Sequence, residues 1–277
     1  YNQTGAIIKK SWYVNGKRHR DKKPAYIEYE LSFSKGPSLE IWHHRGKIHR
    51  NGKPAYISYY KYSERNIFEE RWYKHGKIHR EEQPACIIHD YCSSNILLQK
   101  WCLNGKIHRT GDLPAIIKYT QGSRSCEEWC INNKHHREGA PAYIEYNQYD
   151  IATCKRWLLK GLYSQKHFPN YVSSYPTGDI YNMIWYDENC KFHRGEDKPA
   201  NIKYNENGSV LQLLWYTHGK CHRDSGPAYR KYFSDGKNSL ERECWYAYGK
   251  EHRSNGRPAH VEYFSSGKIK CNKYFIN

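Results

Sequence analysis

Tryptophan recurs through this chain at a nearly constant interval, and that period limits the possible fold more than any other feature. Successive tryptophans lie 28 to 30 residues apart, and the nine of them are all that the protein contains. They are Trp12, Trp42, Trp72, Trp101, Trp129, Trp157, Trp185, Trp215 and Trp245. Such a period is typical of arrays in which each repeat packs only against its neighbours. We therefore expect a row of about nine similar units.

Each unit carries the same motif, which predicts β-hairpins. After Trp, the pattern Tyr-x-Asn-Gly-Lys-x-His-Arg leads through a few polar residues to Pro-Ala-x-Ile-x-Tyr, as in residues 12–29. The pair Asn15-Gly16 favours a tight turn with positive φ between two extended segments. Pro24 suits the first residue of a strand, where a missing N–H does least harm. Beyond it, Ala, Ile and Tyr alternate with other residues, which indicates a strand with one buried face and one wet face.

The composition agrees with strands and supports an all-β fold. Aromatic residues make up 16% of the chain, with 27 Tyr, while Met occurs once; aromatic side chains favour strands. We predict an elongated array of about nine hairpin repeats of 28–30 residues. Residues 1–156 would hold repeats one to five, beginning in the middle of a repeat; residues 157–184 a degenerate sixth; and residues 185–277 repeats seven to nine with a C-terminal capping strand.

The sixth unit departs from the pattern. After Trp157 there is no His-Arg pair, and Pro169-Asn170 stands where the other units have Pro-Ala. Two interpretations remain open. One is drift in a tolerant repeat, and the other is a bend or a partner-specific site in a unit released from the repeat pattern.

The run Trp-x-x-x-Gly-Lys-x-His, with a glycine closing the preceding strand at Gly122, Gly208 and Gly236, resembles the MORN repeat. The likeness covers nearly the entire chain. It departs in the longer period, in the Arg that follows His, and in the Pro-Ala that begins the second strand. This variant resembles the longer MORN-like arrays of large DNA viruses, and the Asn-, Lys-, Ile- and Tyr-rich composition suits an AT-rich viral genome. The resemblance implies scaffolding, self-association or proximity to a membrane, in the host cytoplasm or the virion.

Much of the positive charge lies in the repeated Lys-x-His-Arg segment. Its eight Lys and eight Arg are comparable in number to the net charge of +17. The lysines are Lys17, Lys47, Lys77, Lys106, Lys134, Lys191, Lys220 and Lys250. If the repeats stack in register, these residues form a basic row suited to phosphates or anionic headgroups. Alternatively the Arg are structural and pair with acids such as Asp21 and Glu81, which leaves Lys at the turn as the better contact residue.

Tyrosines that follow the Pro-Ala pair are the second set of candidate contact residues. Tyr26, Tyr56, Tyr143 and Tyr229 are predicted to lie on the wet face of the sheet, where aromatic side chains would suit a protein partner.

Catalysis, cofactors and metals are not expected. The chain has no paired Cys-x-x-Cys units and no His-Glu-x-x-His motif, and a motif repeated eight times cannot be one active site. The ten Cys are irregularly placed, so we expect mostly free thiols in a reducing cytoplasmic compartment. No apolar run is long enough to span a membrane. We therefore expect a non-catalytic scaffold with a protein partner or assembly, homo-oligomers included. The alternative is a polyanion binder for nucleic acid, a nucleotide or an anionic membrane surface.

Overall fold

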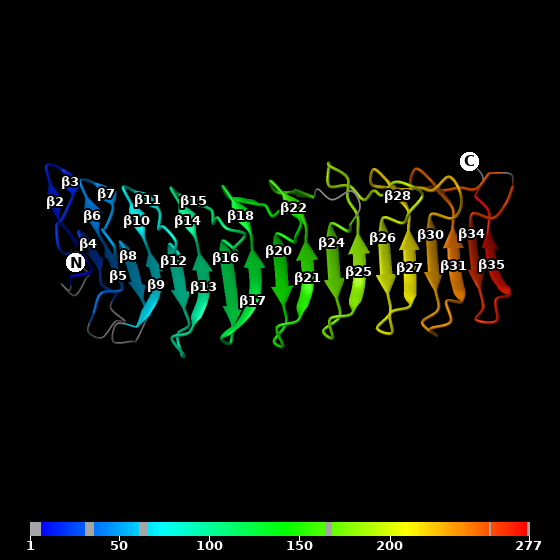
Figure 1. The fold of residues 1–277 in the computed structure, drawn as a ribbon, viewed down its shortest axis with the longest axis horizontal. Helices are drawn as coiled ribbons and strands as arrows, with labels where there is room; N and C mark the ends of the chain where they lie inside the picture. Colours follow the sequence, from blue (N-terminus) through cyan, green and yellow to red (C-terminus); the bar gives the residue numbers. More distant parts are fainter. Residues whose placement is uncertain (1–6, 31–35, 61–65, 164–167, 255, 276–277) are drawn as a thin grey trace. The chain divides into compact units, whose positions relative to one another are not determined.

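Residues 7–30, 36–60, 66–163, 168–254 and 256–275 are described by the computed structural model (Figure 1). No helix occurs among these residues. The chain divides into two compact units, Tyr1–Lys134 and His135–Asn277. Each unit is a row of antiparallel hairpins that follow one another in chain order. The predicted all-β array of repeated hairpins is therefore confirmed.

Unit 1 contains a single antiparallel sheet whose strands pair in sequence order. Its described long strands are β1 (Lys9–Ser11), β4 (Tyr26–Glu28), β5 (Leu39–Ile41), β8 (Tyr56–Tyr59), β9 (Ile67–Arg71), β12 (Cys86–His89), β13 (Ile96–Lys100), β16 (Ile116–Thr120) and β17 (Ser123–Glu128). Each repeat contributes two of these strands, one on either side of the tryptophan-containing segment.

Unit 2 repeats the same arrangement. Its described long strands are β20 (Tyr143–Tyr146), β21 (Ala152–Arg156), β24 (Tyr171–Ser174), β25 (Ile180–Ile184), β26 (Asn201–Tyr204), β27 (Val210–Leu214), β30 (Tyr229–Tyr232), β31 (Leu240–Cys244), β34 (His260–Tyr263) and β35 (Ile269–Lys273). A register shift interrupts most of the pairings just before the last residue of the first strand, as between Lys231 and Tyr232.

Between the long strands, directly after each tryptophan, the chain forms a short hairpin of two-residue strands. These strands are β2 (Tyr13–Val14), β3 (Lys17–Arg18), β6 (His43–His44), β7 (Lys47–Ile48), β10 (Tyr73–Lys74), β11 (Lys77–Ile78), β14 (Cys102–Leu103), β15 (Lys106–Ile107), β18 (Cys130–Ile131), β19 (Lys134–His135), β22 (Leu158–Leu159), β23 (Leu162–Tyr163), β28 (Tyr216–Thr217), β29 (Lys220–Cys221), β32 (Tyr246–Ala247) and β33 (Lys250–Glu251). In the seventh repeat only an isolated bridge joins Tyr186 to Phe192.

The turns of the short hairpins have the geometry that the Asn-Gly pairs predict. Asn15 and Gly16 have φ angles of 49° and 70°, which define a type I′ turn together with the short pairing on either side. The first turn position also accepts bulkier residues at positive φ, such as His75 at 50° and Tyr248 at 48°. A non-glycine residue is strained there, so these turns need support from their surroundings.

Tryptophan and alanine form the centre of each repeat. In the second repeat, the Trp42 N–H donates to the Ala55 carbonyl at 2.8 Å, and the Ala55 N–H donates to the Arg71 carbonyl at 2.9 Å. Ala55 is fully buried, and Trp42 is 7% exposed. Trp12, Trp157 and Trp245 are half-buried and the other six indoles are buried. The predicted core position of tryptophan is confirmed within each unit.

The sixth repeat keeps the fold despite its sequence. Asn170 takes the alanine position and is fully buried. Its carbonyl accepts the Trp157 N–H at 2.9 Å, and its side-chain oxygen accepts the Tyr186 N–H at 2.7 Å. Residues 164–167, where the His-Arg pair is missing, lie outside the described residues. Whether this repeat is a partner site stays a prediction.

The cysteines that occupy matching positions in neighbouring repeats are not bonded to each other. Cys102 and Cys130 each follow a tryptophan in unit 1, and both are free thiols, as predicted. Cys86, Cys154 and Cys244 are also free and buried, so thiols act here as small side chains of the interior.

Replacing Trp101 by Ala is expected to lower the free energy of unfolding by roughly 3 to 5 kcal/mol, because the indole is buried and no neighbour can fill its volume. Urea denaturation followed by circular dichroism measures this change. Tyr149→Ala is the control, since Tyr149 is 71% exposed and should change stability by less than about 0.5 kcal/mol. An equally small effect for both variants would contradict the core assignment.

Candidate functional site

The turn lysines form an exposed row in each unit. The lysine row consists of Lys17, Lys47, Lys77, Lys106 and Lys134 in unit 1, and Lys191, Lys220 and Lys250 in unit 2, and all are exposed. Five of the stems, those of Lys17, Lys47, Lys77, Lys191 and Lys220, lie over the glycine of the next turn. A Cβ placed on Gly46 would sit 3.5 Å from the Cβ of Lys17, and one on Gly219 would sit 3.4 Å from that of Lys191. Packing of the stem leaves the ammonium group in solvent.

The glycine at this turn position is therefore required for two reasons. It supplies the positive φ of the turn, and it leaves room for the preceding lysine. Gly76 shows both features, with a φ of 88° and the Lys47 side chain 3.7 Å from the place that a Cβ would occupy. Its N–H donates to the Ile48 carbonyl of the preceding repeat at 2.8 Å. The stacked turns thus hold successive lysines about two strand spacings, roughly 10 Å, apart.

In six repeats the histidine of the motif joins its short hairpin to the next one, whereas His108 Nδ1 makes no such bond. His19 Nδ1 accepts the backbone N–H of Arg45 at 3.1 Å, and His79 Nδ1 accepts that of Asn104 at 3.0 Å. Nδ1 also accepts an equivalent backbone N–H bond in four further histidines, which are His49, His136, His193 and His222. In every case the donor is the first turn residue of the following repeat. The imidazole therefore supports the residue whose positive φ is strained.

Ring stacking adds to this support. His75 stacks on His49 with ring centroids 4.5 Å apart and an interplanar angle of 8°. Tyr248 stacks in the same way on His222, at 4.0 Å and 17°. Aromatic residues at the turn position thus cover the histidine of the preceding repeat. The sequence motif alone could not show this contact, since it depends on the alignment of neighbouring turns.

In four repeats an acidic residue two positions after the histidine lies beside its Nε2 atom. His19 Nε2 lies 3.0 Å from Asp21 Oδ1, and His222 Nε2 lies 3.2 Å from Asp224 Oδ1. Because Nδ1 already accepts an amide proton, Nε2 carries the ring proton and donates to the carboxylate. These acids were expected as partners of the adjacent arginines. They pair with histidine instead, because the arginine is turned toward tryptophan.

The arginine of the His-Arg pair covers the tryptophan of its own repeat. The Arg50 guanidinium carbon lies 3.9 Å from the Trp42 ring centroid, and Arg50 Nη1 donates to the Pro54 carbonyl at 3.1 Å. The same stacking occurs for Arg20, Arg80, Arg109, Arg194, Arg223 and Arg253. Cation–π contact and a proline carbonyl bond together account for six of these guanidiniums, while Arg223 pairs through two nitrogens with the Asp197 carboxylate. Arginine therefore contributes to the packing of each repeat, while lysine stays exposed.

The tyrosines predicted on the wet face are half-buried. Tyr26, Tyr56, Tyr143 and Tyr229 all have intermediate exposure. Arginine guanidiniums lie over three of the rings, with Arg18 4.7 Å from the Tyr26 centroid and Arg71 4.8 Å from that of Tyr56. Burial is the main cause that raises the pKa of Tyr56 and of Tyr229. These hydroxyls and ring edges are reachable, but the ring faces are partly covered.

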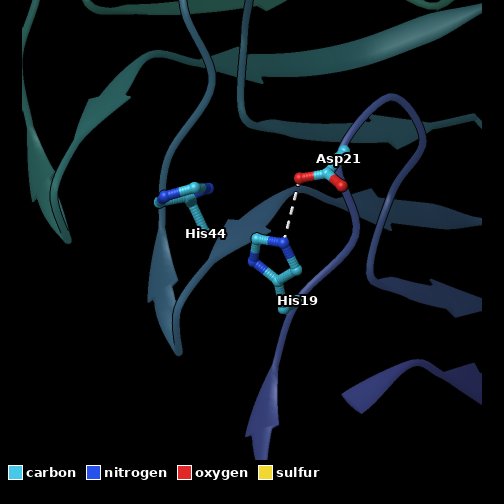
Figure 2. A group of neighbouring side chains, drawn as sticks. All are labelled: His19, Asp21 and His44. Carbon is cyan, nitrogen blue, oxygen red and sulfur yellow. Dashed lines mark hydrogen bonds and ion pairs between the residues drawn. The ribbon is translucent and has the colours of Figure 1, made fainter. Parts of the chain in front are cut away.

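Figure 2 shows His19, Asp21 and His44, a group whose donor atoms come close enough to suggest a metal ion. The hydrogen bonds argue against that interpretation. A metal at His19 Nε2 would move the ring proton to Nδ1, where it would face the Arg45 N–H that Nδ1 now accepts at 3.1 Å. The His-acid pair also recurs as His79 with Glu81, 3.4 Å apart, where it belongs to the repeat. His19 and Asp21 are thus structural.

The chain matches no known protein-family model, and no curated protein is similar to it at a significant level. Among the residues that the structure describes, no helix is both long enough and apolar enough to cross a bilayer.

We expect the protein to lose stability as the pH falls below about 6.5. Burial is the largest cause that lowers the pKa of both His49 and His193. A histidine whose pKa is lower in the folded than in the unfolded chain stabilises the fold fully at pH values above the unfolded pKa of about 6.5. This contribution to stability decreases as the pH falls from there toward the folded pKa. Protonation also removes Nδ1 as an acceptor. Thermal unfolding followed between about pH 7.5 and pH 5 measures the effect.

The double variant His49→Gln, His193→Gln should show a weaker pH dependence than the wild-type chain, since two of the titrating rings are gone. A melting temperature that rises toward pH 5, or an unchanged slope in the double variant, would contradict the assigned role of these rings.

Proposed function

We propose that the chain is a non-catalytic scaffold of the MORN type that binds a partner along the exposed edge of its short hairpins. The observation that carries this proposal is that the residues of the repeated motif differ in exposure and in contacts. Histidine and arginine are occupied by contacts within and between repeats, while lysine is exposed at every described turn that carries it. What remains for a partner is therefore the turn edge.

The state of the buried thiols supports a role without catalysis. Burial is the main cause that raises the pKa of Cys86 and of Cys130 to about 12. Nucleophilic catalysis needs the thiolate, and these groups are neutral at physiological pH. Six of the repeated histidines are likewise held by backbone N–H groups.

The edge also carries exposed apolar side chains beside the lysines, which favours a protein partner or a second copy of the chain. In unit 1, Tyr13 is 57% exposed and Val14 is 52% exposed. In unit 2, Leu162 is 53% exposed and Tyr248 is 63% exposed. Apolar and aromatic groups surrounded by charge are typical of protein interfaces.

The MORN assignment and its viral variant rest on the motif resemblance together with the repeated hairpins. We propose on that basis a source among large DNA viruses, with the protein in the host cytoplasm or the virion. The half-buried tyrosines Tyr26, Tyr56, Tyr143 and Tyr229 are proposed as secondary contacts through their hydroxyls.

Site-specific photo-crosslinking tests where the partner binds. A photoreactive amino acid at Leu162 in the short-hairpin edge should cross-link to a partner or to another copy of the chain, while the same group at Tyr149, in the turn between β20 and β21, should not. Both positions are exposed and belong to unit 2. Cross-linking that is equal at the two sites, or confined to Tyr149, would overturn the assignment of the edge.

A polyanion is the second candidate ligand, and the lysine row is the observation that favours it. Reversing Lys47, Lys77 and Lys106 to Glu should leave the fold intact, because these side chains are exposed, while affinity for nucleic acid or anionic vesicles should collapse. The dependence of the logarithm of affinity on the logarithm of salt concentration should also weaken, by up to about three units of slope.

The matched control reverses Lys22, Lys23 and Lys53 to Glu. These lysines are exposed in the loops after the His-Arg pairs, and their reversal changes the net charge by the same amount. Equal losses in both variants would mean that net charge alone attracts the ligand. An absence of binding by the wild-type chain at low salt would remove the polyanion candidate, because a net charge of +17 should give at least non-specific attraction there.

A further inference from the structure

Three side chains that offer metal-ligand atoms meet in the interior of the ninth repeat. Cys244 ends β31, Glu251 ends β33, and His260 begins β34. Cys244 Sγ lies 3.5 Å from His260 Nδ1, and that nitrogen lies 3.5 Å from Glu251 Oε1. One atom from each of the three residues lies within 4.8 Å of the other two. The short hairpin and two long strands therefore contribute to one polar cluster.

The cluster differs from the same positions of the second repeat, which are apolar or aromatic. The positions equivalent to Cys244, Glu251 and His260 in the second repeat are Ile41, Ile48 and Tyr56. Cys244 is 3% exposed and His260 is 7% exposed. Buried polar groups cost free energy unless they are satisfied, and here each of the three has hydrogen-bond partners within the cluster or beside it.

The hydrogen bonds of the cluster indicate which nitrogen of His260 is free to bind a cation. His260 Nε2 lies 3.1 Å from Glu262 Oε1, so the ring proton belongs on Nε2. The lone pair on Nδ1 then faces the Cys244 thiol, which donates its S–H proton while it stays protonated, and the Glu251 carboxylate, which accepts. Tyr246 donates its hydroxyl proton to the same Glu251 oxygen at 3.1 Å. A cation between Nδ1, Sγ and Oε1 would satisfy all three groups.

We infer that Cys244, Glu251 and His260 form a structural zinc site. Thiolate and imidazole are ligands that favour zinc over magnesium or calcium. In tetrahedral zinc sites with bonds of about 2.0 to 2.3 Å, ligand atoms lie roughly 3.3 to 3.6 Å apart. The two 3.5 Å separations have this spacing. Binding displaces the thiol proton to solvent and leaves a fourth position for water.

Residues around the cluster orient the histidine as zinc sites require. A ligand histidine usually donates its second ring N–H to a carboxylate, and Glu262 has that position. Arg242 Nη2 lies 3.1 Å from Glu262 Oε1 and fixes the carboxylate in turn. The same three groups resemble a Cys-His-Glu nucleophile, but a sulfur that is 3% exposed is closed to a substrate. A metal ion needs no such access.

Cobalt and zinc titrations of the full chain, stripped of metal, test the proposal. One equivalent of Co²⁺ should produce visible d–d absorption and a near-ultraviolet thiolate-to-cobalt band, and Zn²⁺ should remove both. Zinc should also raise the melting temperature. The absence of a cobalt–thiolate band in the wild-type chain would overturn the proposal.

Variants that copy the other repeats separate metal binding from folding. His260→Tyr and Glu251→Ile restore residue types found at the equivalent positions Tyr56 and Ile48, so both should fold. Each should lose the zinc-dependent rise in melting temperature. Cys244→Ser should lose the thiolate-to-cobalt band.

Cys86→Ser is the matched control, since Cys86 is also buried and its thiol lies 3.4 Å from a carboxylate oxygen of Glu69. It should keep the cobalt spectrum. Wild-type spectra in Cys244→Ser and in His260→Tyr, or loss of the spectrum only in Cys86→Ser, would refute the assignment.

Discussion

The contact between successive short hairpins is the constraint on which each unit depends. A two-residue strand pair is too small to be stable by itself in water. Here the turn glycine donates its N–H to a carbonyl of the preceding repeat, as Gly105 does to Ile78 at 2.8 Å. One position earlier in the turn, Asn104 donates to the His79 ring at 3.0 Å. This turn is thus held at both of its positive-φ residues by the repeat before it, and the turns that follow His19, His49, His136, His193 and His222 are held in the same way.

This contact explains why only one residue of the Lys-x-His-Arg motif presents its charge to solvent. The histidine must be neutral to accept through Nδ1, the arginine must lie flat on tryptophan, and only the lysine is left with a solvated charge. Cation–π contacts keep their energy when the ring and the guanidinium are partly desolvated, so the seven stacked arginines stabilise the repeats from a position that a ligand reaches poorly. Function is therefore more readily carried by lysine and the apolar residues beside it.

The fold was predictable because its determinants are local and repeated. Asn15-Gly16 defines a turn, Pro24-Ala25 begins a strand, and nine copies of one pattern strengthen each assignment. The exposure of Tyr26 and Tyr56 was harder to predict, since strand alternation identifies two faces but not the short hairpin residues that cover one of them. The partner of His19 was also hidden, because it is a backbone N–H 26 residues further along the chain.

The zinc site has no sequence signature for the same reason. Cys244, Glu251 and His260 are spaced by 7 and 9 residues, and they meet only because β31 pairs with β34 while the short hairpin folds toward both. In a repeat protein, stability is close to a sum of local terms and contacts between neighbours. A metal bound inside one repeat would therefore strengthen that repeat and its contact with the adjacent one, with little effect on distant repeats. Repetition makes such a substitution possible, because a single unit can acquire ligands at these positions while the others preserve the fold.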